Sequence, residues 1–340
     1  MPLNRILCTA AAATALAFSA GCTTLHSPPE AANPTAPASL YDSTLIASHA
    51  AQAITLAQLG QELADADVVI IGEYHGHQAS HLLQSRVQQQ LHSRNPRQVL
   101  TLEQFNLDHQ AALDAYLAGE SGEQELIEDA NAWDNYQASY RPLVELARDH
   151  GLPVIAANAP ADTVRCVGQV GPAYLAQLPE AERQALPAEP FLDTPAYREK
   201  FNNAISRSHG QGDPGTAERM EKIYQAQLLR DNTMATQILN ARERFPGHQI
   251  LHLTGNFHSE QGLGTVALLK QRAPELSIQV LSPVFWPRAQ TEAPLADNLD
   301  KGDYLYLIRP LPPEYRNEDR QRKAMQERFS KRPDVRCEAN

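Results

Sequence analysis

Two short motifs place a histidine directly after an apolar run of residues. Gly72-Glu73-Tyr74-His75 follows the run 67–71, and Gly255-Asn256-Phe257-His258 follows the run 249–253. Each motif consists of a glycine, a polar residue, an aromatic residue and a histidine, and we expect each run to form a strand. Ligands bind beyond the carboxyl ends of the strands in parallel α/β sheets. The two motifs are therefore predicted to face one pocket.

A carboxylate, Glu103, ends a third apolar run at 98–102. Carboxylates and imidazoles bind metal ions and transfer protons. Four such groups are expected at the shared pocket, namely Glu73, His75, Glu103 and His258. Three further residues are expected to support them from behind, namely Asn256, Arg230 and Asp231. The alternative is that the two histidines only cap helices or lie buried as neutral imidazoles, but their matched positions favour the shared pocket.

Short apolar runs alternate with helical segments along most of the chain. This pattern predicts an α/β fold with a mostly parallel sheet that is flanked by helices. The expected strands are 67–72, 98–103, 153–158, 248–255 and 276–281, with 304–308 as an edge strand. The expected helices are 78–92, 108–119, 123–129, 136–150, 217–244 and 262–272. Residues 160–240 contain no expected strand and are predicted to form a helical insertion over the sheet.

The composition is that of a globular protein. Of the 340 residues, 42% are hydrophobic and 20% are charged, which excludes disorder or a coiled coil for the bulk of the chain. The formal net charge is −11. Proteins that bind nucleic acid do so largely through a basic surface, so we expect no nucleic-acid partner.

The first residues are predicted to be a signal peptide. Arg5 precedes an apolar run at 6–20, which has the length of a signal sequence and is short for a membrane span. Ser19-Ala20-Gly21-Cys22 resembles a bacterial lipobox, in which the cysteine is lipidated and becomes the first residue. Thr23, rather than an aspartate, follows this cysteine, which by resemblance to Gram-negative lipoproteins favours the outer membrane over the inner one. We expect the anchored protein to lie on the periplasmic face of that membrane.

This interpretation divides the chain into four parts. Residues 1–21 are the signal peptide, 22–40 a lipidated tether, 41–310 the α/β domain and 311–340 a charged tail. The mature chain retains Cys166 and Cys337 besides the lipidated cysteine. Export makes a disulfide between them chemically feasible. Two cysteines so far apart form no scaffold pattern, so their pairing stays open from the sequence.

Several motifs together resemble the ChaN-like haem-binding lipoproteins of the Tiki superfamily. Besides the histidine motifs and Glu103, they are Trp133-Asp134-x-Tyr136, Tyr140-x-Pro142, Val154-Ile155-Ala156-Ala157-Asn158 and Arg230-Asp231-x-x-Met234-Ala235. The resemblance covers about residues 48–284. It implies non-covalent haem binding in iron acquisition, by a homodimer that holds two stacked haems. It also implies a tyrosine on the iron and a histidine that reaches across from the partner.

Tyrosines and one histidine are the candidate iron ligands. They are Tyr136 and Tyr140, Tyr224 on a separate helix, and His209 in a Ser-His-Gly segment. A phenolate is a suitable donor for ferric iron, but aromatic residues at helical spacing also pack protein cores, so the sequence does not choose among them. The chain has no Cys-x-x-Cys-His motif, which excludes covalent attachment of haem.

We therefore predict a haem-binding lipoprotein that holds haem at the periplasmic face of the outer membrane. The alternative is a metal-dependent hydrolase, because the wider superfamily includes peptidases and erythromycin-esterase-like enzymes that use the equivalents of Glu73, His75 and His258. In that case the two histidines and one or two of the glutamates would bind a divalent ion such as zinc, manganese or cobalt, and one glutamate, Glu73, would act as general base. A third class is a tethered interaction module with a vestigial pocket.

Overall fold

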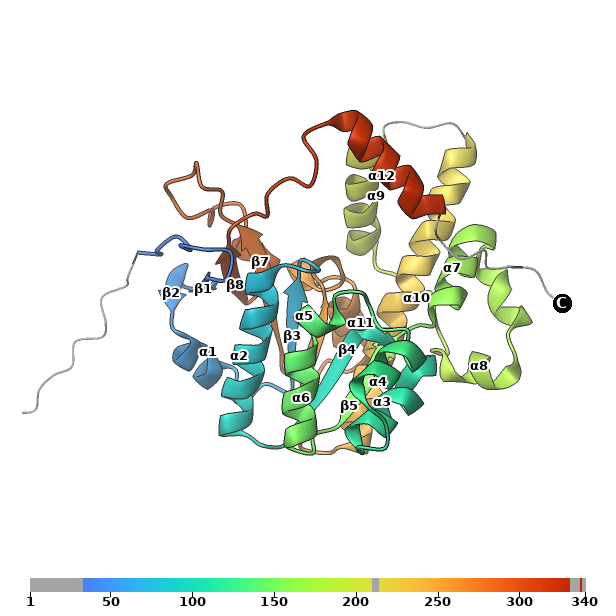
Figure 1. The fold of residues 1–340 in the computed structure, drawn as a ribbon, viewed down its shortest axis with the longest axis horizontal. Coiled ribbons are helices and arrows are strands. Elements are labelled where there is room, and N and C mark those ends of the chain that lie inside the picture. The colour runs from blue at the N-terminus through green and yellow to red at the C-terminus, as the bar shows by residue number, and fades with distance from the viewer. Residues whose placement is uncertain (1–32, 210–213, 331–336, 338–340) are drawn as a thin grey trace, which may run out of the picture. The chain divides into compact units, whose positions relative to one another are not determined.

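An eight-stranded sheet forms the centre of the described chain (Figure 1). The computed structural model describes residues 33–209, 214–330 and 337. The strands are β1 (Ser43–Ala47), β2 (Gln52–Ile54), β3 (Val68–Glu73), β4 (Gln98–Asn106), β5 (Val154–Asn158), β6 (Gln249–Gly255), β7 (Ile278–Phe285) and β8 (Tyr304–Ile308). Their order in the sheet is β2-β1-β8-β7-β3-β6-β4-β5. The six strands from β8 to β5 in this order are parallel to one another. The predicted α/β fold with a mostly parallel sheet is confirmed.

Helices cover both faces of the sheet. They are α1 (Leu56–Glu62), α2 (Gln78–Arg94), α3 (Gln110–Leu117), α4 (Glu123–Asp129), α5 (Tyr136–Ser139), α6 (Arg141–Asp149), α7 (Ala161–Val170), α8 (Glu180–Ala185), α9 (Pro195–His209), α10 (Pro214–Arg244), α11 (Thr265–Arg272) and α12 (Glu318–Ser330). Successive strand side chains point to opposite faces. Val69 and Ile71 therefore pack with the helices from α1 to α6, whereas Val68 and Ile70 pack with α10 and α11.

The edge of the sheet differs from the prediction. β8 is not an edge strand, because it pairs with β7 on one side and with β1 on the other. The sequence interpretation omitted β1 and β2, which extend the sheet in antiparallel pairs. β1 and its partner β8 come from opposite ends of the folded chain, so no local pattern marks their pairing.

The stretch predicted as an insertion is helical where it is described. It consists of α7, the 3₁₀ helix η2 (Pro172–Gln177), α8, α9 and most of α10. Among the described residues of 160–240, none forms a strand. Helix α10 packs against β5 and α11, and it thereby carries its side chains to the carboxyl ends of the strands.

Residues just before β1 also contact the sheet. Arg309 Nε, next to β8, donates a hydrogen bond to the carbonyl of Pro37 at 2.6 Å. The signal peptide and Cys22 lie outside the described residues, so lipidation remains a prediction. Within the described chain, no helix has the length and apolar character needed to cross a bilayer.

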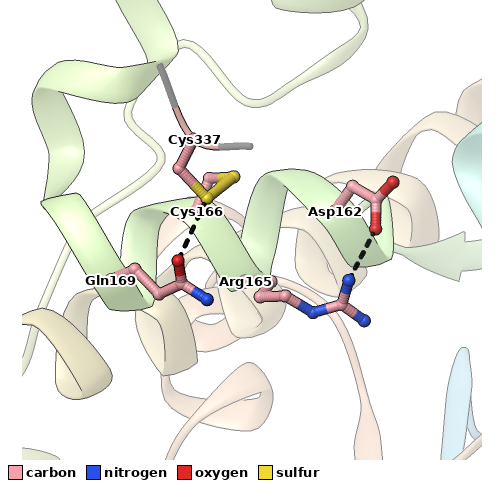
Figure 2. Close-up of a disulfide and its surroundings, with 5 residues drawn as sticks. All are labelled: Asp162, Arg165, Cys166, Gln169 and Cys337. Atoms are coloured by element: carbon pink, nitrogen blue, oxygen red, sulfur yellow. Dashed lines mark hydrogen bonds and ion pairs between the residues drawn. A yellow bond between two sulfur atoms is a disulfide. The ribbon is translucent and has the colours of Figure 1, made fainter. Parts of the chain in front are cut away.

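A disulfide joins Cys166 on α7 to Cys337 in the C-terminal tail (Figure 2). The Cα atoms of the two cysteines are 5.2 Å apart. Gln169 and the ion pair of Arg165 with Asp162 lie beside the bond on the same helix. The pairing that the sequence left open is therefore present, and it ties the charged tail back to α7.

We expect Cys337→Ser to lower the free energy of unfolding by about 2–4 kcal/mol, because a disulfide that closes a long loop restricts the unfolded chain. Urea unfolding under oxidising conditions measures the difference. Cys166→Ser and the double variant serve as controls and should match the single variant. Two titratable thiols in the denatured, unreduced wild type would show that the bond does not form.

Candidate functional site

The carboxyl ends of three strands meet at one edge of the sheet. β3 and β6 are parallel neighbours with Glu73 opposite Gly255, and β4 lies on the other side of β6. The 3₁₀ helix η3 (Asn256–His258) follows β6 directly. Glu103 lies in the last half of β4, next to an irregularity in its pairing with β5. This topology brings Glu73, His75, Glu103 and His258 to the same edge.

Glu73 is a buried carboxylate that holds His75. Its Oε1 atom lies 2.7 Å from His75 Nδ1 and accepts a hydrogen bond from the Tyr140 hydroxyl at 2.5 Å. Its Oε2 atom accepts from Gln84 Nε2 at 2.6 Å. The His75 side chain is 47% exposed. Burial lowers the pKa of His75, but the hydrogen bond with Glu73 and the charges of Glu103 and Glu73 together outweigh burial and leave the pKa above its ordinary value.

His258 is buried between two carboxylates. Its Nδ1 atom lies 2.9 Å from Asp231 Oδ1, and its Nε2 atom lies 3.6 Å from Glu103 Oε1. Burial lowers the pKa of His258, but Asp231 and Glu103 raise it above the ordinary value. Burial also acts to raise the pKa of Glu103, yet His258, His75 and the backbone N–H of Gly255 lower it to about 2. Glu103 is therefore ionised at neutral pH.

Helix α10 supplies the groups behind His258. Asp231 also accepts hydrogen bonds from the Tyr197 hydroxyl at 2.7 Å and from the backbone N–H of Thr265 at 2.9 Å. Arg230, next to Asp231, lies close enough to Glu103 and Asp231 to feel their charges, although burial dominates and lowers the pKa of its guanidinium. Asp231 thus contacts a site histidine directly, whereas Arg230 acts on the site through its charge.

A pocket of about 520 Å³ opens at this edge of the sheet. Small-molecule sites have volumes of about 300–1,000 Å³. Its wall contains Glu73, His75 and His258, whereas Glu103, which was also expected at this pocket, is buried and does not line it. Asn256 also lines the pocket and donates a hydrogen bond to Glu260 rather than to a histidine.

The sequence interpretation missed several residues that line the pocket, among them Tyr74, Phe257, Glu260 and Lys301. Tyr74, which stacks on Phe285 with ring centroids 4.2 Å apart, and Phe257 form apolar walls. Both are the aromatic residues of the two histidine motifs, so the motifs themselves could have indicated them. Lys301 also lines the pocket but belongs to no motif.

The predicted tyrosine ligands are not exposed in this pocket. The side chains of Tyr136, Tyr140 and Tyr224 are buried, and none of them lines the pocket. Tyr140 donates a hydrogen bond to Glu73, which lines the pocket, and Tyr224 donates one to Asp193. Burial raises the pKa of all three phenols, which disfavours the phenolate. Their role as iron ligands stays a prediction. His209 ends α9, and its side chain lies outside those described.

The expected divalent-ion site is not preformed. Within the described part of the chain, no group of three or more His, Cys, Asp or Glu side chains is arranged to hold a metal ion. Glu73 is instead engaged by His75, Tyr140 and Gln84, and Glu103 by His258, the Thr254 hydroxyl and the backbone N–H of Gly255. The four predicted groups form two carboxylate–imidazole pairs.

Comparison with known proteins identifies the relatives of this chain. A family model described as haem-binding uptake, Tiki superfamily, ChaN matches residues 59–269. The chain belongs to the ChaN family. The resemblance noted in the sequence is thereby confirmed. No curated protein matches the chain.

A solved structure of a relative supports the fold of this ChaN-family protein. The structure of ChaN of Campylobacter jejuni with cofacial haem binding matches with a TM-score of 0.59 and 19% identity, and the match covers 79% of this chain and 98% of that one. An erythromycin esterase in its open conformation has a TM-score of 0.43 and 14% identity over 79% of this chain and 82% of that chain. A protein from Bacillus cereus has a TM-score of 0.45 and 11% identity, and the match covers 75% of this chain and 92% of that chain.

Proposed function

We propose that this ChaN-family protein binds haem non-covalently in the strand-end pocket, with His75 as the iron donor. The match to the haem-binding family model carries the proposal. The pocket also fits the group, because it combines a volume of about 520 Å³, the aromatic walls Tyr74 and Phe257, and an accessible imidazole. Bound haem would supply the iron, and the chain would orient and shield it.

His75 is the best-placed donor among the described residues. Metal-binding histidines usually donate their second ring N–H to a carboxylate or carbonyl group. Glu73 occupies this position at Nδ1, which leaves Nε2 as the donor atom beside Gly255. His258 is less suitable, because Asp231 and Glu103 flank both of its ring nitrogens.

We further propose that the mature protein is anchored through Cys22 to the periplasmic face of the outer membrane, serves iron acquisition and dimerises on binding haem. The lipobox-like sequence Ser19-Ala20-Gly21-Cys22 and the proline-rich tether support the anchor. Cofacial haem binding in the Campylobacter jejuni relative motivates the dimer. Palmitate labelling of the full chain, compared with Cys22→Ala, tests the anchor.

Titration with haemin tests the central proposal. The soluble chain that begins at residue 23 should give a saturable shift of the Soret band. Sedimentation with and without haemin should show whether the protein dimerises on binding. A titration indistinguishable from that of free haemin would contradict haem binding.

We expect Gly255→Ala to weaken haemin binding about tenfold while leaving stability nearly unchanged. A Cβ at residue 255 would lie 2.9 Å from His75 Nε2, on the side where this nitrogen meets the pocket. The exposed imidazole can move aside, so the fold should tolerate the methyl group. Gly168→Ala on α7 is the control, because its Cβ would make only an ordinary contact at 3.5 Å. Equal affinities for the two variants would argue against donation by Nε2.

The hydrolase remains the second candidate, because each site imidazole is held by a carboxylate. A carboxylate that orients a histidine is a common arrangement in general acid–base catalysis. His258 with Asp231 and His75 with Glu73 both have this geometry. Turnover of peptide or ester substrates with added zinc, manganese or cobalt, and its loss in Glu73→Gln, would support the hydrolase. Inactivity with all three metals would count against it.

A further inference from the structure

Lys301 lies where two pockets meet. The strand-end pocket and a neighbouring pocket of about 690 Å³ beside α9 share Phe257, Glu260 and Lys301 as lining residues. Lys301 is half-buried and ends the 3₁₀ helix η5 (Leu299–Lys301). A ligand in the strand-end pocket would therefore have this ammonium group at its side.

Glu260, the other charged residue that lines both pockets, is already paired. Lys200 Nζ donates to the carbonyl of Phe257 at 2.9 Å and lies 3.2 Å from Glu260 Oε1. The second carboxylate oxygen of Glu260 accepts from Asn256 Nδ2 at 2.5 Å. Glu260 thus has both oxygens engaged. In residues 33–209 and 214–330, no hydrogen bond or ion pair involves the Lys301 ammonium.

The backbone of Lys301 is fixed against β7. Its carbonyl accepts a hydrogen bond from Ser282 Oγ at 2.8 Å, and its N–H donates to the carbonyl of Asn298 at 3.1 Å. The next residue, Gly302, packs so closely that a Cβ would lie 2.8 Å from the carbonyl oxygen of Val280. The side chain therefore starts from a well-defined position, and only its end has freedom within the cleft.

We propose that Lys301 binds a carboxylate of the ligand in the strand-end pocket and thereby selects ligands that carry a peripheral acidic group. The inference rests on the proposed haem binding, in which this carboxylate is a propionate. A charged hydrogen bond is stronger than a neutral one, and partial desolvation strengthens it further. Lys301 has no competing carboxylate in the strand-end pocket, because Glu260 is engaged by Lys200 and Asn256, and Glu73 is engaged by His75.

Comparing haemin with its dimethyl ester isolates the contact between Lys301 and a propionate, because the ester carries no propionate charge. Both are titrated into the mature chain, into Lys301→Met and into Lys301→Arg. The wild type should prefer haemin about five- to tenfold, as expected of one half-buried charged contact. Lys301→Met should bind both ligands equally, and Lys301→Arg should retain the preference.

Lys270→Met is the matched control, because Lys270 is an exposed lysine that lines a different pocket. It should retain the full preference for haemin. A preference that survives in Lys301→Met would overturn the assignment of Lys301 and leave haem binding intact. Failure of the wild type to bind either ligand would overturn both proposals together.

Discussion

Replacing His75 with alanine is expected to weaken haemin binding by about 100-fold. Loss of a residue that only supports a metal ligand costs about 10–100-fold in affinity, so loss of the donor itself should reach the upper end. The His75 side chain is 47% exposed, and its removal should leave the fold intact. Absorbance titration gives the affinity, and the band positions report the change of iron ligand.

Tyr140→Phe and Tyr224→Phe are the informative comparisons for this variant. Tyr140→Phe removes one of the hydrogen bonds to Glu73 and should weaken binding only modestly, because the imidazole remains. Tyr224→Phe removes a contact with Asp193 away from the pocket and should have no effect on affinity. If His75→Ala binds normally and either tyrosine variant loses the spectrum, the iron donor is that tyrosine.

The strands of the parallel sheet were predictable because both of their faces are buried. Runs such as 68–71 are apolar without interruption, and they stand out from the amphipathic helices around them. The location of the site was predictable from the same strands, because parallel strands have their carboxyl ends at one edge of the sheet. The two histidine motifs lie side by side, as expected, because β3 and β6 are neighbours, with Glu73 opposite Gly255.

Other features depend on contacts that local sequence does not encode. β1 pairs with β8 from the far end of the domain, and Lys301 reaches the pocket only because η5 is fastened to β7. The tyrosines illustrate a different ambiguity. Tyr140 has the helical spacing of a ligand-binding face, but the same spacing serves core packing, and the structure buries its hydroxyl against Glu73.

Asp231→Ala is expected to lower the free energy of unfolding by about 3–5 kcal/mol, because it leaves a buried charge without its partner. Asp231 accepts hydrogen bonds from Tyr197, Thr265 and His258, and all of these donors would lose their acceptor. Asp162→Ala is the control, since Asp162 pairs with Arg165 at an exposed site where removal costs about 1 kcal/mol or less. Urea unfolding measures both variants.

The destabilisation by Asp231→Ala should also depend on pH. Asp231 and Glu103 raise the pKa of His258 in the folded state above its ordinary value of 6.5. The resulting stabilisation is fully present below pH 6.5 and is lost as the pH rises through the raised pKa. The difference between wild type and Asp231→Ala should therefore be larger at pH 6 than at pH 9. A difference that is constant with pH would mean that hydrogen bonding by Asp231, rather than its charge on His258, accounts for its contribution.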